Sequence, residues 1–360
     1  MNFSIEKIIR PHILTLTPYA SARDEYSGKE GVFLDANENP YGSVVSENYN
    51  RYPDPHQAAI KQKLAPIKGV RPTQIFLGNG SDEPIDLLIR ATCTPRQDSI
   101  LIMPPTYGMY QVSADVNDVA VIKVPLTPDF QIDTDVVLTA ITPHTKIIWI
   151  CSPNNPTGNL LQKDAVIRLI ENFNGLVVVD EAYIDFVTPN PSEGLKPSER
   201  FLSELDNYPN LVVLQTLSKA WGLAALRLGM CFASEGLIAL LNKIKSPYNL
   251  SSPVQKLVLE ALDNVEQKNE MVVQILKQRE ALQENLSQLS IVRHIYPTDS
   301  NSLLVKFEDV AATMRHLIDQ KIIVRDRSKV ILCEGCLRIS IGTAEENEQL
   351  LMALKQLSGS

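Results

Sequence analysis

The sequence predicts an α/β fold, with a mostly parallel seven-stranded sheet between helices in a large domain and a smaller α+β C-terminal domain. Two observations favour this fold. Short, nearly continuous apolar runs alternate with helical patterns over most of the 360 residues, as in parallel strands covered on both faces. After Ser252-Pro253 the amino-acid composition changes, and a long stretch rich in Leu, Glu, Gln and Lys follows, which is typical of helix.

An N-terminal arm over residues 1–30 and a large domain over residues 31–255 are predicted from the first of these patterns. The arm combines a short amphipathic piece with Pro11, Pro18 and a polar stretch that reaches Gly31. The apolar runs of the large domain are the expected strands, and they are Gln74–Leu77, Ser99–Met103, Val119–Val124, Lys146–Cys151, Gly175–Val179, Leu211–Gln215 and Gly229–Ala233. Helical patterns lie between them, including Glu83–Ala91, Tyr107–Val116 and Lys163–Asn172.

A small domain is predicted over residues 256–360, with a long connecting helix at the boundary. Residues 253–290 have the composition of a long helix, with one break expected near Asp263-Asn264. The segments "NSLLVKFED", "KIIVRD" and "CLRISIG" then alternate with a helix around Val310–Gln320 and a final helix from about Glu345. This order gives a compact α+β unit.

Composition excludes several classes of protein. The net charge of −8 argues against a nucleic-acid binder, which usually has a basic face. No run approaches the roughly 18 apolar residues of a membrane helix, so no membrane partner is expected. Five cysteines and no secretory signal predict reduced thiols in the cytoplasm. An acidic protein that binds an anionic small molecule must use a few local arginines, which makes each arginine informative.

Polar or glycine-rich segments follow the predicted strands, at the point where each strand ends. They are "GNGSDE" after Leu77, "PPTYGMY" after Met103, "CSPNNPTG" after Ile150, "DEAY" after Val179 and "TLSK" after Gln215. In open α/β sheets, ligands bind beyond the carboxyl ends of the strands. These segments are therefore expected to surround one crevice.

Each of these segments also has a purely structural explanation. Ser81 and Asp82 begin a helix, where free N–H groups attract anions, but an ordinary N-cap would use the same residues. Asp180 could equally be a cap or turn residue. Lys219 follows the apolar run Leu211–Leu214, so its ammonium group either reaches water or is bonded to something. Taken singly, these alternatives stay open.

Metal chemistry is not predicted. Cys333 and Cys336 have CxxC spacing, but no second cysteine or histidine pair accompanies them, which makes a zinc site improbable. The five histidines are dispersed and have no neighbours of a metal-binding type. No Ser-His-Asp motif is present. The segment "LGNGSDE" is not a phosphate-binding Walker loop, because it lacks the lysine of that motif.

The joint pattern is more specific than its parts. The segments "SPNNPTG", "DEAY" and "TLSKAWGLAALRLG", in this order, resemble the fold-type I aminotransferases that depend on pyridoxal 5′-phosphate. The further segments "LDANENPYG", "YNRYPDPH", "PPTYGMY", "VRD" and "GCLRISIGT" are most similar to the histidinol-phosphate aminotransferase family. The resemblance covers nearly the whole chain and implies the fold of the type I pyridoxal-phosphate-dependent transferases.

The resemblance also implies how the cofactor is held. Lys219 would bind it covalently, and Asp180 would pair with its pyridine nitrogen and keep that nitrogen protonated. Tyr183 and Asn155 would donate to its phenolic oxygen, and Tyr107 would stack on its ring. The phosphate would be held by the backbone N–H groups of Ser81 and Asp82 and by the side chains of Ser218, Arg227 and Thr216. One departure is Ala225, where the family often has glycine.

Substrate binding is implied for residues of both ends of the chain. Arg325 and Arg338 match the family's arginines that bind substrate anions, and the resemblance implies that Asn155 would contact substrate as well as cofactor. Tyr19 in the arm would close over the site. Tyr52 would reach the cofactor phosphate of a neighbouring subunit, which implies a homodimer with shared active sites.

The reaction implied is a ping-pong transfer of an amino group from L-histidinol phosphate to 2-oxoglutarate. It gives imidazole acetol phosphate and L-glutamate, in histidine biosynthesis. Lys219 would act as the general base, with its pKa lowered by the site. The open alternatives are an aromatic amino acid aminotransferase, a threonine-phosphate decarboxylase of the same fold, and a pyridoxal-phosphate-binding sensor without catalysis.

Overall fold

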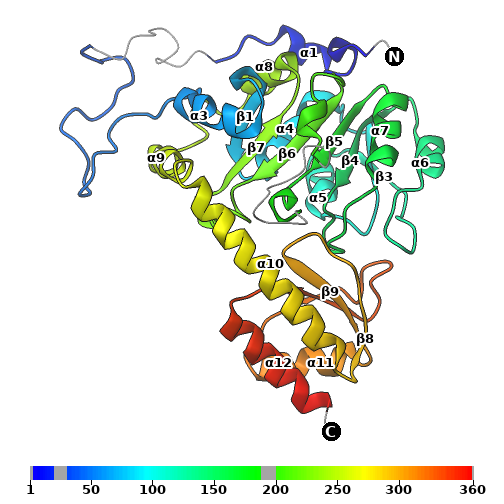
Figure 1. Ribbon diagram of the computed structural model, residues 1–360. Helices are drawn as coiled ribbons and strands as arrows, with labels where there is room; N and C mark the ends of the chain where they lie inside the picture. The colour runs from blue at the N-terminus through cyan, green and yellow to red at the C-terminus, as the bar shows by residue number, and fades with distance from the viewer. Residues whose placement is uncertain (1–2, 20–30, 188–199, 359–360) are drawn as a thin grey trace.

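The computed structural model describes residues 3–19, 31–187 and 200–358. Its larger part is built on one seven-stranded sheet, with strands in the order β1-β7-β6-β5-β4-β2-β3 (Figure 1). The strands are β1 (Ile75–Asn79), β2 (Ser99–Ile102), β3 (Ala120–Lys123), β4 (Thr145–Cys151), β5 (Leu176–Asp180), β6 (Leu211–Thr216) and β7 (Leu228–Phe232). Only β7 runs against its neighbours, so the predicted mostly parallel sheet is confirmed.

Helices cover both faces of this sheet because its strands are apolar on both sides. Ile148 and Ile150 of β4 pack on one side, in the hydrophobic cluster that includes side chains of α3, α6, α7 and α9. Ile147 and Trp149 pack on the other side, with α1, α4, α5 and α8. These helices are α1 (Pro11–Thr15), α3 (Ala58–Lys68), α4 (Asp82–Thr92), α5 (Met109–Val116), α6 (Thr134–Ala140), α7 (Lys163–Asn172), α8 (Glu235–Ile244) and α9 (Ser252–Ala261).

Several boundaries differ by one or two residues from the sequence-based expectation, and three of them concern predicted site residues. The helix expected from Tyr107 begins at Met109, because Gly108 is the N-cap, and Tyr107 therefore lies in the preceding loop. Asp180 and Thr216 are the last residues of their strands and do not follow them. All three shifts leave these side chains at the carboxyl edge of the sheet.

The smaller part follows the long helix α10 (Val265–Ser287), which runs from beside the large sheet to a second sheet (Figure 1). The expected break is present, since α9 ends at Ala261 and Asn264 is the N-cap of α10. The second sheet is antiparallel, in the order β10-β11-β9-β8, and α11 (Val310–Asp319) and α12 (Ala344–Ser358) pack with it. Its strands are β8 (Val292–Ile295), β9 (Ser302–Phe307), β10 (Arg325–Asp326) and β11 (Cys336–Ser340).

The described N-terminal residues pack in two different ways. Ile8, Ile9 and Ile13 are buried against α4 and α8, and Lys243 donates to the carbonyl oxygen of Leu14 at 2.8 Å. The segment of residues 31–52 instead projects away from the body of the molecule (Figure 1). It exposes apolar side chains, among them those of Val32, Leu34, Tyr41, Val44 and Val45.

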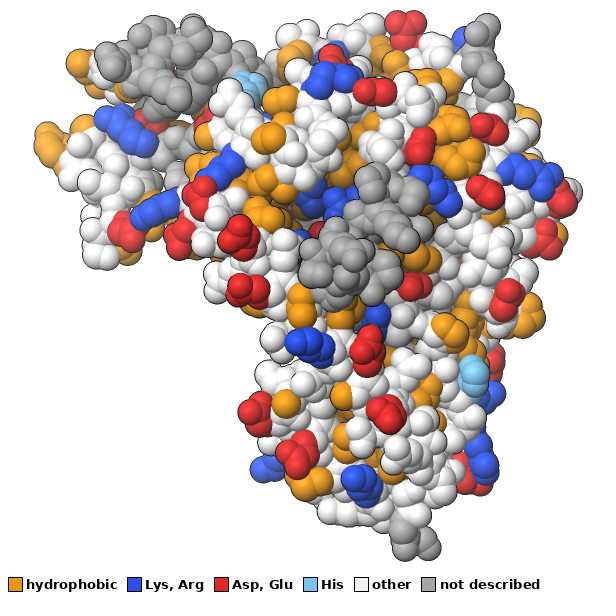
Figure 2. Space-filling view, in the orientation of Figure 1, with side chains coloured by type: hydrophobic (Ala, Val, Ile, Leu, Met, Phe, Trp, Pro, Cys, Tyr) orange, Lys and Arg blue, Asp and Glu red, His pale blue; other side chains and the backbone are white. Residues whose placement is uncertain are grey.

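The surface carries charges of both signs, interspersed on the face that Figure 2 shows. None of the described helices combines the length and the apolar character that crossing a membrane requires. All five cysteines are buried and none forms a disulfide.

Candidate active site

A cavity of about 720 Å³ lies beyond the carboxyl ends of β4, β5 and β6 and is closed on its other side by β10 and β11. It brings together residues that are far apart in the sequence. Every predicted site residue except Tyr19 and Tyr52 lines it: Ser81, Asp82, Tyr107, Asn155, Asp180, Tyr183, Thr216, Ser218, Lys219, Arg227, Arg325 and Arg338. The rule that ligands bind at the carboxyl edge of a parallel sheet therefore locates this cavity correctly.

Asp180 is the buried carboxylate of the cavity, with 2% of the residue exposed. Its Oδ2 atom accepts a hydrogen bond from the hydroxyl of Tyr110 at 2.8 Å, and its Oδ1 atom accepts one from the backbone N–H of Ala182 at 3.0 Å. Tyr110 is itself fixed by stacking on Trp149, with ring centroids 4.9 Å apart. Burial raises the pKa of Asp180 to about 6, although both hydrogen bonds oppose this shift.

A raised carboxyl pKa makes the stability of the ligand-free protein depend on pH. Between about pH 4 and pH 6, folded protein binds a proton at Asp180 that the unfolded chain releases, so this group's contribution to stability falls as pH rises through that window. We expect Asp180→Asn to become more stable relative to the wild type, by roughly 2 kcal/mol, between pH 4.5 and pH 7.5. Urea unfolding of both proteins at several pH values measures this change, and a constant difference would contradict the raised pKa.

Lys219 lines the cavity in the loop that follows β6, and its Nζ atom lies 5.5 Å from the centre of the Tyr183 ring. Within the described residues it forms no ion pair with a carboxylate. The surrounding protein, which takes the ammonium group partly out of water, lowers the pKa of Lys219, and the positive charge of Arg338 lowers it further. The negative charge of Asp180 opposes the shift. The structure thus places this amine in the cavity, in a setting that favours its neutral form.

A hydrogen-bonded chain joins the two sheets across the cavity. Arg338 of β11 donates to the side-chain oxygen of Asn155 at 2.6 Å, and the amide of Asn155 donates to the hydroxyl of Tyr183 at 3.3 Å. Burial raises the pKa of Tyr183, so its hydroxyl stays protonated near neutral pH. Asn155 can therefore transmit the position of the arginine to the tyrosine.

The N-terminus of α4 and Arg227 form one end of the cavity, where an anion could bind. The first N–H groups of a helix have no partner within the helix, and here they belong to the turn that begins at Ser81 and Asp82. Arg227 has a φ of 54°, its carbonyl oxygen accepts from the N–H of Gly80 at 2.7 Å, and its guanidinium lies 3.4 Å from the carboxylate of Asp82. Tyr107 donates to the same carboxylate at 3.2 Å.

Two hydroxyl-bearing residues complete this end of the cavity. Thr216 donates to the carbonyl oxygen of Leu228 at 3.1 Å and accepts from the N–H of Ser218 at 3.0 Å. Ala225, the departure from the family pattern, is exposed in the short helical turn that precedes Arg227.

Gly229 allows strand β7, which follows Arg227, to pass close to the backbone of Gly80 and Ser81. A Cβ atom at Gly229 would lie 2.2 Å from the carbonyl carbon of Gly80 and 2.3 Å from the N atom of Ser81. We expect Gly229→Ala to displace the Ser81 N–H group, to weaken anion binding and to destabilise the fold by about 1–3 kcal/mol. Urea unfolding and phosphate titration measure these effects. Gly236→Ala on α8, where a Cβ meets nothing within 4 Å, should not reduce stability, and equal losses in both variants would contradict the steric explanation.

The sequence analysis missed Arg327, which lines the cavity, and Tyr110, which is buried behind it and bonds to Asp180. Tyr110 is hidden because its bond to Asp180 depends on how α5 packs below β4, which no local pattern reveals. Arg327 was detectable, since it is two residues beyond Arg325 and a strand repeats its facing every second residue.

Tyr19 and Tyr52 do not line the cavity of the single chain. Tyr19 is 74% exposed. Tyr52 is 51% exposed and stacks on Tyr248, with ring centroids 4.5 Å apart. Their predicted contacts with ligand therefore need either movement or a second subunit.

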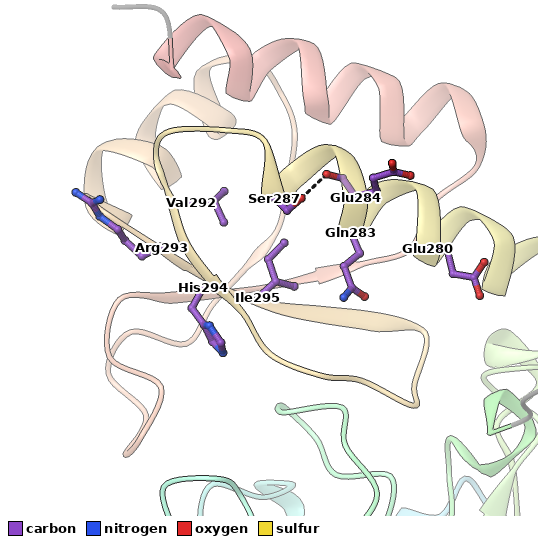
Figure 3. A pocket seen from close by; sticks show the side chains of 8 residues that line it. All are labelled: Glu280, Gln283, Glu284, Ser287, Val292, Arg293, His294 and Ile295. Atoms are coloured by element: carbon purple, nitrogen blue, oxygen red, sulfur yellow. Dashed lines mark hydrogen bonds between the residues drawn. The ribbon is translucent and has the colours of Figure 1, made fainter.

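A second, more open groove lies between α10 and β8 in the smaller part (Figure 3). Glu280, Gln283 and Glu284 of the helix and His294 of the strand line it. It contains none of the predicted site residues, and in the described chain no cluster of three or more His, Cys, Asp or Glu side chains could hold a metal ion.

Comparison with known proteins agrees with the geometry of the larger cavity. Residues 30–354 match the family described as aminotransferase class I and II. The histidinol-phosphate aminotransferase of Cytophaga hutchinsonii is 56% identical over 355 residues, which is 99% of each chain. In fold, the chain is similar to the crystal structure of the histidinol-phosphate aminotransferase from Clostridium acetobutylicum, with a TM-score of 0.78 and 23% identity over 86% of this chain and 91% of that one. The enzyme from Sinorhizobium meliloti in complex with pyridoxal-5′-phosphate gives a TM-score of 0.76 and 22% identity, over 89% and 90% of the chains.

Proposed function

The chain belongs to the class I and II aminotransferase family, and we propose that it transfers the amino group of L-histidinol phosphate to 2-oxoglutarate. The products are imidazole acetol phosphate and L-glutamate, and the reaction belongs to histidine biosynthesis. The single observation that carries this proposal is the cavity itself, which combines the amine of Lys219, the buried carboxylate of Asp180 and separate cationic groups at its two ends.

The cofactor of this enzyme is pyridoxal 5′-phosphate, and the residues of the cavity fit it. Gly80 and Gly229 keep the N-terminus of α4 clear of Cβ atoms, which leaves its N–H groups and Arg227 open to a phosphate. Asp180 can face a protonated pyridine nitrogen, and Tyr183 and Asn155 can donate to the phenolic oxygen. When bound, the cofactor supplies an electron sink for the bond that breaks at the substrate carbon.

The chain's own residues bind and orient the substrates, and they move the proton. The lowered pKa of Lys219 keeps a larger fraction of its Nζ neutral, so that it can take the proton from the carbon that carries the donor's amino group. In the second half of the cycle, the same atom delivers a proton to the carbon that receives the amino group. Arg325 and Arg338 bind the anionic end of donor and acceptor in turn, and Asn155 links Arg338 to the reacting centre.

The test is a scan of amine donors without an oxo acid. Loss of the visible absorbance of the bound cofactor on mixing with histidinol phosphate, and a much weaker response to phenylalanine, would support the proposed substrate. A faster response to phenylalanine would favour an aromatic amino acid aminotransferase. Release of carbon dioxide from O-phosphothreonine would favour the decarboxylase, and no response to any amine would favour a binding protein.

A homodimer is part of the proposal, with Tyr52 of each subunit reaching the cofactor phosphate of the other and Tyr19 closing over the site. The support is the segment 31–52, which projects from the body of the molecule (Figure 1) and exposes the side chains of Val32, Leu34, Tyr41, Val44 and Val45. Tyr52 ends this segment and is exposed.

Mixed dimers test the shared site. If Tyr52 acts across the interface, combining the two inactive variants Lys219→Ala and Tyr52→Ala creates dimers in which one site carries both changes and the other site carries neither. Activity should then return on co-refolding or co-expression. No return of activity would show that Tyr52 acts within its own subunit or not at all.

Domain limits and compartment complete the proposal. We place the arm at residues 1–30, the large domain at 31–255 and the small domain at 256–360; the two sheets and the helix that joins them support a division into two domains. We also place the enzyme in the cytoplasm, where its five unpaired, buried cysteines would remain reduced.

A further inference from the structure

Three arginines, and not only the two predicted from the sequence, line the β10–β11 side of the cavity. Arg325 lies directly opposite Arg338 in the antiparallel β10–β11 pair, and directly opposite residues have side chains on the same face. The N–H of Arg327 donates to the carbonyl oxygen of Cys336 at 3.0 Å, which continues this ladder by two residues. Because strand side chains repeat their facing every second residue, Arg327 lies on the same face as Arg325.

Arg327 has donors that the described protein does not use. Its Nε atom is buried and has no hydrogen-bond partner in the described part of the chain. Of the three arginines, Arg338 donates to Asn155, and none forms an ion pair with a described carboxylate. Burial lowers the pKa of Arg327, and the positive charges of Arg338 and Arg325 lower it further. An unpaired buried donor among like charges is costly, and an anionic ligand would offset that cost.

The number of guanidinium groups distinguishes between two kinds of anion. The cofactor phosphate has its own cationic group, Arg227, at the N-terminus of α4. The amine donor of the proposed reaction ends in a phosphate, with up to two negative charges and three free oxygen atoms. Glutamate and 2-oxoglutarate each carry two carboxylates, and the one that would take the place of the phosphate has one charge and two oxygen atoms, which two arginines can already satisfy.

We propose that Arg327 donates to the phosphate group of the amine donor and thereby selects a phosphate over a carboxylate at this end of the cavity. This inference rests on the proposed function, because it requires an amine donor that carries a phosphate. It makes Arg327 a residue of substrate specificity in addition to the predicted pair.

The experiment uses the complete enzyme with its cofactor and compares Arg327→Gln with the wild type in the two half-reactions. The second-order rate constant of the half-reaction should fall about 10- to 100-fold with histidinol phosphate as the donor and less than about threefold with glutamate. Arg327→Lys should recover part of the loss, since it restores the charge but not the forked donors. Lys329→Gln is the matched control, because Lys329 is an exposed cation of the same loop that does not line the cavity.

Equal losses for both donors would overturn the inference, because Arg327 would then only shape the site. No loss for either donor would overturn it as well. Failure of the wild type to react with histidinol phosphate would refute the proposed donor instead. In that case inorganic phosphate decides about Arg327. Arg327→Gln should weaken inhibition of the glutamate half-reaction by phosphate more than inhibition by acetate, and an unchanged ratio of the two inhibition constants would overturn the inference.

Discussion

Lys219→Ala is expected to lower the rate of transamination by about 10⁴-fold or more, because it removes the group proposed to move the proton and to bind the cofactor covalently. Lys219→Arg should be equally inactive. It keeps a positive charge beside Asp180 and Tyr183, but a guanidinium does not lose its proton in a protein. The pair of variants therefore separates the charge of Lys219 from its proton transfer.

The measurement has two parts. Steady-state rates give the loss of activity, and mass spectrometry after borohydride reduction shows whether the peptide with Lys219 carries the pyridoxyl group. Lys243→Ala is the control, since Lys243 is a lysine of α8 that bonds to Leu14 and does not line the cavity. A wild-type protein saturated with cofactor but without the adduct on Lys219 would refute the proposed site.

Asp180→Asn is expected to reduce activity by roughly a hundred- to a thousandfold, the range found when one electrostatic group of an active site is lost. The amide is nearly the same size as the carboxylate and can still accept from Tyr110, but it carries no charge to oppose a protonated pyridine nitrogen. Affinity for the cofactor should fall as well. Single-turnover rates and cofactor titrations measure the two effects.

Glu181→Gln is a closely matched control for this prediction. Burial raises the pKa of Glu181 to about 6, as it does for Asp180. Glu181 accepts instead from the N–H of Phe201 at 2.7 Å and from the amide of Gln215 at 2.8 Å, and it does not line the cavity. Its replacement should change stability but leave activity within about threefold of the wild type. Equal losses in both variants would mean that burying a charge, and not its position, is what matters.

The sheet and its carboxyl edge could be predicted because the information is local. Uninterrupted apolar runs identify parallel strands, and the residue type changes where each run ends, as at Asp180 and Thr216. The strand β8 (Val292–Ile295) was not predicted, because it is short, partly exposed and without an apolar run. The partnership of Tyr110 with Asp180 depends on the packing of a helix below a strand, which the spacing of apolar residues does not encode.

The arm shows a different limit of sequence-based prediction. Ile8, Ile9 and Ile13 are buried against α4 and α8, which an amphipathic pattern permits but does not specify. Tyr19 and Tyr52 are exposed in the single chain, and their proposed contacts need either movement or a second copy of the chain. A resemblance in one sequence can single out such residues as candidate ligand-binding residues, but it cannot say where their side chains lie in the folded protein.

The reversed direction of β7 sets a limit on how this enzyme can change in evolution. Thr216 of β6 lies opposite Gly229 of β7, so the chain leaves the reactive edge at the lysine loop and re-enters the sheet from that same edge just after Arg227. One short excursion of the backbone thus determines how far the amine of Lys219 stands from the guanidinium of Arg227, at the proposed phosphate-binding end. Insertions or deletions between residues 217 and 227 would change that span directly, whereas loops at the opposite edge of the sheet can vary in length at little cost to catalysis.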